Sequence, residues 1–130
     1  MDLEYFLKDV NFDKQFKRLQ RKLKGKTVVI YGTGQLFQFI HEKYDLSSIN
    51  IIAVSDGKYG QDDKGKEFLG YKIVPITDVA ELNPDYVVVA ILNYMDIIYN
   101  FEKIVFKKTK TKIIPLAQKR LRAILKEIWQ

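Results

Sequence analysis

The sequence predicts an α/β domain in which a doubly wound, mostly parallel sheet lies between two layers of helices. Short apolar runs at residues 27–31, 51–54 and 86–92 alternate with segments whose apolar residues recur at helical spacing. These runs lack the polar alternation of a half-exposed strand, which indicates strands that are buried on both faces of a parallel sheet. The chain has 130 residues, 47% of them hydrophobic, and this is enough for one cooperative core.

Two helices are expected in an N-terminal helical segment, residues 1–25. Their apolar residues recur mostly at steps of three and four, namely Leu3, Phe6, Leu7 and Val10, then Phe12, Phe16, Leu19 and Leu23. Asn11 and Asp13 lie near the join and are candidate N-caps, and Gly25 ends the second helix.

A βαβ unit follows this segment. The strand at 27–31 leads into a glycine turn at 32–34, and a helical stripe then runs to about residue 44. The second strand is expected at 51–54, with a right-handed crossover between the two strands. The glycine-rich, acidic stretch 55–70 is predicted to be a surface loop at the carboxyl end of this strand.

The rest of the chain continues the alternation. We expect, in order, a strand at 72–74 closed by Pro75, a short helix capped by Thr77, the strongest strand at 86–92, a helix over 97–105 and a strand at 112–114 stopped by Pro115. Residues 26–115 then form the α/β domain. Residues 116–130 are predicted to form a basic amphipathic helix with Leu121, Ile124, Leu125 and Ile128 on its apolar stripe, and the whole chain to be one compact unit.

The glycine turn is the strongest candidate for a binding site. A strand that feeds a Gly-x-Gly turn at a helix N-terminus presents unpaired N–H groups and a positive dipole end to a phosphate. Gly32 would make the tight turn, and Gly34 would let a phosphate approach the backbone. Thr33 and Gln35 would add side-chain donors. The alternative is a turn that only shapes the fold.

Three further residues bear on this site. Asp56 lies 24 residues after Gly32, at the end of the second strand, where an acid would accept hydrogen bonds from ribose hydroxyls. Asn93 follows the strongest strand and is either a ligand contact or a helix cap. Phe37 occupies the third position of the dinucleotide fingerprint, where glycine or alanine is usual.

Three stretches of the chain carry a family resemblance: VVIYGTGQLFQFI, IIAVSDGKYGQDDKGKEFLGYKIVPITDV and DYVVVAI. Together they resemble the Rossmann-like, CoA-binding-type nucleotide-binding domain of bacterial polysaccharide and sugar-nucleotide biosynthesis proteins, over about residues 26–115. The resemblance implies that Gly32, Thr33 and Gly34 bind the phosphates of a nucleotide or sugar nucleotide. It also implies that Asp56 binds ribose or sugar hydroxyls.

Composition excludes several other kinds of site. The chain has no cysteine, so disulfides, thiolate zinc sites and cysteine nucleophiles are ruled out, and the single histidine, His41, rules out a multi-histidine metal site. We expect no metal. No apolar run approaches the ~18 residues of a transmembrane segment, and the N-terminus is acidic where a secretory signal is basic. These features predict a cytoplasmic protein.

Charge is distributed unevenly along the chain. Residues 1–26 carry 8 basic and 4 acidic groups, residues 27–101 carry 5 and 10, and residues 102–130 carry 9 and 2. An acidic centre argues against a nucleic-acid surface on the domain, and we expect no nucleic-acid partner. The basic terminal helices are either solvated faces or contact surfaces for an anionic partner, and they are the expected route to a homodimer or a partner domain.

These observations together predict a nucleotide or nucleotide-sugar binding module with an accessory or regulatory role in bacterial surface-polysaccharide and sugar-nucleotide metabolism. NAD(P) or a nucleotide sugar is the expected ligand. The first alternative is the cofactor-binding fragment of an NAD(P)-dependent sugar-nucleotide oxidoreductase. The second is a non-catalytic oligomerisation or protein-interaction domain with a vestigial nucleotide site. We do not expect the chain to be a complete enzyme by itself, because it has no room for a second mononucleotide-binding half and a substrate domain.

Overall fold

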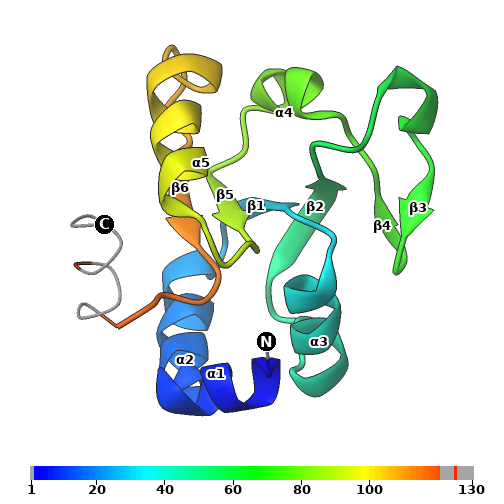
Figure 1. Cartoon of the computed structure of the whole chain (residues 1–130). Helices are drawn as coiled ribbons and strands as arrows, with labels where there is room; N and C mark the ends of the chain where they lie inside the picture. Colours follow the sequence, from blue (N-terminus) through cyan, green and yellow to red (C-terminus); the bar gives the residue numbers. More distant parts are fainter. Residues whose placement is uncertain (1, 121–124, 126–130) are drawn as a thin grey trace.

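The computed structural model describes residues 2–120 and residue 125, and its centre is one four-stranded sheet (Figure 1). The strands lie in the order β2-β1-β5-β6, and every neighbouring pair is parallel. Their bounds are β1 Thr27–Tyr31, β2 Asn50–Ser55, β5 Tyr86–Val89 and β6 Lys112–Pro115. The chain runs outward from β1 to β2 and then crosses back over β1 to β5, so the sheet is doubly wound, as the sequence predicts.

Helices cover both faces of the sheet (Figure 1). One face carries α1 (Leu3–Asp9), α2 (Phe12–Leu23) and α3 (Gln35–Lys43), and the other carries α4 (Ile76–Leu82) and α5 (Met95–Asn100), which continues into the π-helical turn η2 (Phe101–Val105). This arrangement confirms the predicted three layers. None of the helices in residues 2–120 is long and apolar enough to cross a membrane.

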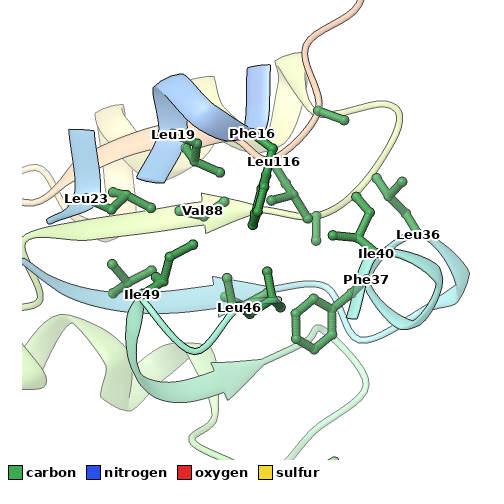
Figure 2. Close-up of a cluster of buried hydrophobic side chains, with 14 of the residues drawn as sticks. Phe16, Leu19, Leu23, Leu36, Phe37, Ile40, Leu46, Ile49, Val88 and Leu116 are labelled. Atoms are coloured by element: carbon green, nitrogen blue, oxygen red, sulfur yellow. The ribbon is translucent and has the colours of Figure 1, made fainter. Parts of the chain in front are cut away.

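Each face of the sheet has its own hydrophobic core because side chains alternate along a strand. Val28 and Val88 pack under α1, α2 and α3, whereas Val29 and Val87 pack under α4 and α5, and all four are essentially inaccessible to solvent. Figure 2 shows Phe16, Leu19 and Leu23 of α2 packing over Val88 and Leu116, with Phe37 and Ile40 of α3 in the same cluster. The apolar stripes predicted for the N-terminal segment therefore face the sheet.

The predicted loop at 55–70 contains more structure than expected. It holds a short 3-10 turn, Gln61–Asp63, and the strand β3 (Glu67–Phe68). β3 forms an antiparallel hairpin with β4 (Tyr71–Lys72), which follows the predicted loop. The strand expected at 72–74 is shifted: β4 ends at Lys72, and Ile73 makes only an isolated parallel bridge to Val54 of the main sheet. Leu69 and Gly70 join the arms with positive φ angles, which primed two-residue turns require.

Several predicted helix starts differ in detail. Asn11 occupies the N-cap of α2, but its backbone adopts the left-handed helical conformation and its side chain makes no capping hydrogen bond. Asp13 lies in the first turn, where its carboxylate accepts a hydrogen bond from the Tyr44 hydroxyl at 2.6 Å. Pro75, not Thr77, caps α4, because the fixed φ of proline suits the start of a helix.

The C-terminal part also departs from expectation. The strongest predicted strand ends at Val89 rather than at residue 92, and β6 includes Pro115 as its last residue. The helix predicted from residue 116 does not begin there, since residues 116–120 are not helical. The rest of that prediction lies outside the described residues, apart from Leu125, which is helical and exposed.

Candidate functional site

The glycine turn connects β1 to α3 through a position that only glycine fits. Gly32 has a φ of +110°, and a Cβ there would lie 2.8 Å from Ile91 Cγ1 and 2.9 Å from the Ala90 carbonyl oxygen. Both the backbone conformation and the close approach to the end of β5 therefore exclude a side chain. This confirms the role of Gly32 in a tight turn.

Gly34 keeps the N-terminus of α3 open. It is the N-cap residue of this nine-residue helix, and a Cβ built on it would meet no atom within 4 Å. The N–H groups of the first turn have no acceptor inside a helix, and the aligned peptide dipoles give this end a partial positive charge. The open space above Gly34 is therefore suited to an anion.

Thr33, between the two glycines, faces into the protein. The Thr33 N–H donates to Asp56 Oδ2 at 2.8 Å, the Thr33 hydroxyl lies 3.1 Å from the same oxygen, and the Tyr59 hydroxyl lies 3.0 Å from the Thr33 hydroxyl. Thr33 is fully buried. The expectation that its hydroxyl donates to a ligand is wrong for this conformation, because that donor is already used by Asp56.

Asp56 thus ties the end of β2 to the glycine turn. Burial raises the pKa of Asp56, but hydrogen bonds from Thr33 and from the Lys58 N–H, together with the Lys58 charge, outweigh it and hold this pKa below its usual value. The side chain is therefore ionised near neutral pH. A carboxylate has about four acceptor positions, and three protein donors leave room at Asp56 for one more.

A crevice of about 360 Å³ joins these elements at the carboxyl ends of β1, β2 and β5. The predicted site residues that line it are Gly32, Gly34, Gln35, Asp56 and Asn93. The remaining lining residues are apolar: Leu3, Leu36, Ala90, Ile91 and Leu92. The crevice lies where the chain changes direction between β1 and β5, which is where open α/β sheets bind ligands.

Asn93 lies at the far side of this crevice. Tyr94, and not Asn93, is the N-cap of α5, so the helix-cap alternative for Asn93 is wrong. The Asn93 Oδ1 accepts a hydrogen bond from Lys119 Nζ at 3.2 Å, and the residue is exposed. Asn93 thus contributes an exposed polar side chain to the lining of the crevice.

Comparison with known proteins agrees with this architecture. A family model described as C2185-like, N-terminal matches residues 24–114, which include the whole main sheet except Pro115, the last residue of β6. The chain belongs to the C2185-like, N-terminal family. No curated protein matches the sequence significantly.

The fold of this C2185-like, N-terminal domain also occurs in a solved structure. The crystal structure of RSP in complex with β-NAD⁺ and operator DNA aligns with a TM-score of 0.50 and 14% sequence identity. The alignment covers 90% of this chain and 62% of the RSP chain. At this identity the similarity shows a shared Rossmann-like fold.

One residue of the domain has a role that the sequence pattern did not indicate. Phe37 is fully buried, and its ring lies 6.4 Å from that of Phe68 and 6.1 Å from that of Tyr71. The residue at the third fingerprint position therefore anchors the β3–β4 hairpin on α3, and it does not line the crevice.

The sequence pattern also did not indicate Leu3 and Tyr59, because contacts between separate segments bring these two residues to the site.

Proposed function

We propose that this domain binds a nucleotide or a nucleotide sugar in the crevice at the glycine turn. The observation that carries the proposal is the convergence of Gly32, Gly34, Gln35, Asp56 and Asn93 on one crevice. These residues follow the strands β1, β2 and β5, which are parallel, so the carboxyl ends of the three strands meet at the switch point of the sheet. The volume of about 360 Å³ is within the range of small-molecule sites.

The phosphate end of the ligand fits the start of α3. The Thr33 N–H is held by Asp56, so the N–H groups that remain for a phosphate begin at Gly34. Gln35 is exposed on the first turn and adds a side-chain amide donor. An anion here gains from the helix dipole and from directed hydrogen bonds.

The sugar end fits Asp56. Its remaining acceptor position suits one ribose or sugar hydroxyl, and its negative charge disfavours a phosphate on the same sugar. This supports a ligand with an unmodified ribose, and hence NAD over NADP among the nicotinamide cofactors. The apolar side chains of Ile91 and Leu92 suit the flat ring of a base.

The β-NAD⁺ in the RSP structure supports NAD⁺ as a candidate ligand. A second candidate function is the cofactor-binding part of an NAD(P)-dependent sugar-nucleotide oxidoreductase. Phe37 stands where the dinucleotide fingerprint has glycine or alanine, but its side chain packs against the hairpin and is not among the residues that line the crevice. The accessory or regulatory role in surface-polysaccharide and sugar-nucleotide metabolism rests on the resemblance of residues 26–115. The absence of a nucleic-acid partner stays a prediction.

A thermal-shift screen tests this function. The purified chain is heated with NAD⁺, NADP⁺, UDP-sugars, coenzyme A, ATP or S-adenosylmethionine. A ligand at a hundred times its dissociation constant adds about 2.7 kcal/mol of stability, which raises the midpoint by several degrees. We expect NAD⁺ or a UDP-sugar to do so.

The control for this screen is Gly34→Val. Its side chain projects into open space, so the fold is kept while the phosphate position is filled. The proposal predicts that this variant loses the ligand-induced shift. If no compound at millimolar concentration shifts the midpoint of the unmodified chain, the proposal is wrong. That result would favour the alternative of a non-catalytic oligomerisation or protein-interaction domain.

A further inference from the structure

A second concave surface lies between α2 and β6. This groove has a volume of about 380 Å³. Its lining residues are Gln15, Arg18, Leu19, Lys22, Ile114, Pro115, Leu116 and Gln118. None of these described lining residues is acidic, and none of them lines the crevice at the glycine turn. The groove therefore requires its own explanation.

The two cations of the groove have no counter-ion in the part of the chain that the structure describes. Arg18 and Lys22 are exposed, and neither takes part in an ion pair or a side-chain hydrogen bond among residues 2–120. They are one helical turn apart on α2, so both project on the same flank of the helix. Their charges add at one wall of the groove.

The other wall is the outer edge of β6, which no strand pairs with among residues 2–120. β6 is the last strand in the order β2-β1-β5-β6, and the Lys112 and Leu116 N–H groups donate toward the β5 side. Successive residues of a strand point their backbone N–H and C=O groups to opposite sides. The N–H and C=O of Ile113 and the C=O of Pro115 therefore point away from β5. This edge offers the Ile113 N–H and two carbonyls to a further strand, while Pro115 supplies no donor.

We propose that this groove binds an extended acidic segment of a partner protein. The segment adds as a short strand along the outer edge of β6, and carboxylates at alternate positions pair with Arg18 and Lys22. Residues four apart on a helix are about 6 Å apart along its axis. Alternate residues of a strand are about 6.7 Å apart. Acids at every second position of a strand therefore match the spacing of the two cations.

Charge argues against the chain's own C-terminal residues as the occupant of this groove. The Gln15 side chain donates to the Gln118 carbonyl at 2.9 Å and accepts from the Gln118 N–H at 2.8 Å, which holds the chain at the groove's end. The Arg120 side chain donates to the Asp9 carbonyl oxygen at the end of α1. Residues 119–130 carry four basic groups and only one acid, Glu127, which is the wrong charge for this groove.

Binding of a designed peptide tests the proposal directly. The probe is a short fluorescein-labelled peptide in which glutamate alternates with valine, and fluorescence anisotropy reports its binding to the full chain. The comparison peptide has glutamine in place of glutamate. We expect the acidic peptide to bind, its affinity to fall as salt rises, and the glutamine peptide to bind at least about tenfold more weakly.

The helix offers a matched pair of double variants. Arg18→Glu with Lys22→Glu reverses the two groove cations. Lys17→Glu with Arg21→Glu makes the same change of charge at exposed positions of α2 that do not line the groove. We expect the first pair to weaken peptide binding by about tenfold or more and the second to leave it within about twofold. Circular dichroism confirms that both variants are folded.

Hydrogen exchange at β6 tests the strand addition separately from the charges. We expect the peptide to slow exchange of the Ile113 N–H, because this donor gains an acceptor. Equal weakening by the two double variants would overturn the proposal, since it would show attraction to overall charge. An unchanged exchange rate of the Ile113 N–H in the presence of the peptide would also overturn it. A third contradicting result would be that the acidic peptide fails to bind while a DNA duplex or an anionic vesicle binds Arg18 and Lys22.

Discussion

The crevice at the glycine turn and the groove beside β6 enclose similar volumes, about 360 and 380 Å³, but different interactions determine their structure. In the crevice the backbone of Gly32 touches the end of β5, and Asp56 holds the turn through two bonds to Thr33. In the groove, Arg18 and Lys22 are exposed side chains on the surface of α2.

This difference separates shape from charge as sources of recognition. Gly32 and Asp56 of the crevice also hold the turn in place, so changes at these two residues should alter stability and binding together. The charge of the groove comes from Arg18 and Lys22, which are exposed and make no ion pair among the described residues, so changing these two side chains should alter binding alone. The predictions below test this contrast, from the largest expected effect on stability to the smallest.

Phe37→Ala should have the largest effect on stability. The fully buried ring joins α3, one wall of the crevice, to Phe68 and Tyr71 of the hairpin. Removing it leaves a cavity in that contact, and we expect a loss of about 3 to 5 kcal/mol in the free energy of unfolding. Urea denaturation measures this loss. A cost below about 1 kcal/mol would show that the crevice wall does not depend on this contact.

Gly32→Ala should have the next largest effect. The new Cβ would lie within 3 Å of Ile91 and of the Ala90 carbonyl, at a φ that L residues rarely adopt. Strain and overpacking together should cost on the order of 3 kcal/mol. Gly34→Ala is the matched control, because its Cβ meets nothing and the expected cost is below about 1 kcal/mol. Equal costs for the two variants would contradict the geometry of the turn.

Asp56→Asn should cost about 1 to 2 kcal/mol at neutral pH, because an amide oxygen is a weaker acceptor than a carboxylate for the Thr33 donors. The pKa of Asp56 is lowered in the folded protein, so its stabilisation is present above the unfolded value near 4 and is lost as pH falls through the folded value. The difference between the two proteins should therefore shrink below pH 4. Urea titrations at several pH values measure it, and a difference that grew with acidity would contradict the assignment.

The charge reversal in the groove should have the smallest effect on stability. Arg18→Glu with Lys22→Glu removes no ion pair among the described residues, so we expect a change within about 0.5 kcal/mol. The thermal midpoint measures it. A loss of 2 kcal/mol or more would mean that these cations support the fold, and the contrast between the two regions would fail.

The sequence predicts the sheet and the place of the crevice because both depend on local patterns. The apolar runs at 27–31 and 86–92 are recognisable as buried strands without knowledge of their partners. The positions of Gly32 and Asp56 follow from their places at the ends of consecutive strands, since parallel strands end at one edge of the sheet.

Other features could not be predicted because they depend on contacts between segments. The β3–β4 hairpin has arms of two residues, which are too short to show a period. The bonds from Thr33 to Asp56 depend on the direction of a side chain, which packing decides. Leu3 reaches the crevice only because α1 packs on the same face as α3, and no pattern near residue 3 indicates this.

The most direct test of the central claim is an NMR titration of the ¹⁵N-labelled chain with NAD⁺ and, separately, with a UDP-sugar. Nucleotide binding at the glycine turn predicts that one of these ligands shifts the amide signals of Gly34 and Gln35, while those of Arg18 and Lys22 stay unchanged. If neither ligand moves the Gly34 and Gln35 signals at millimolar concentration, or if the groove signals move instead, the nucleotide site is not at this turn.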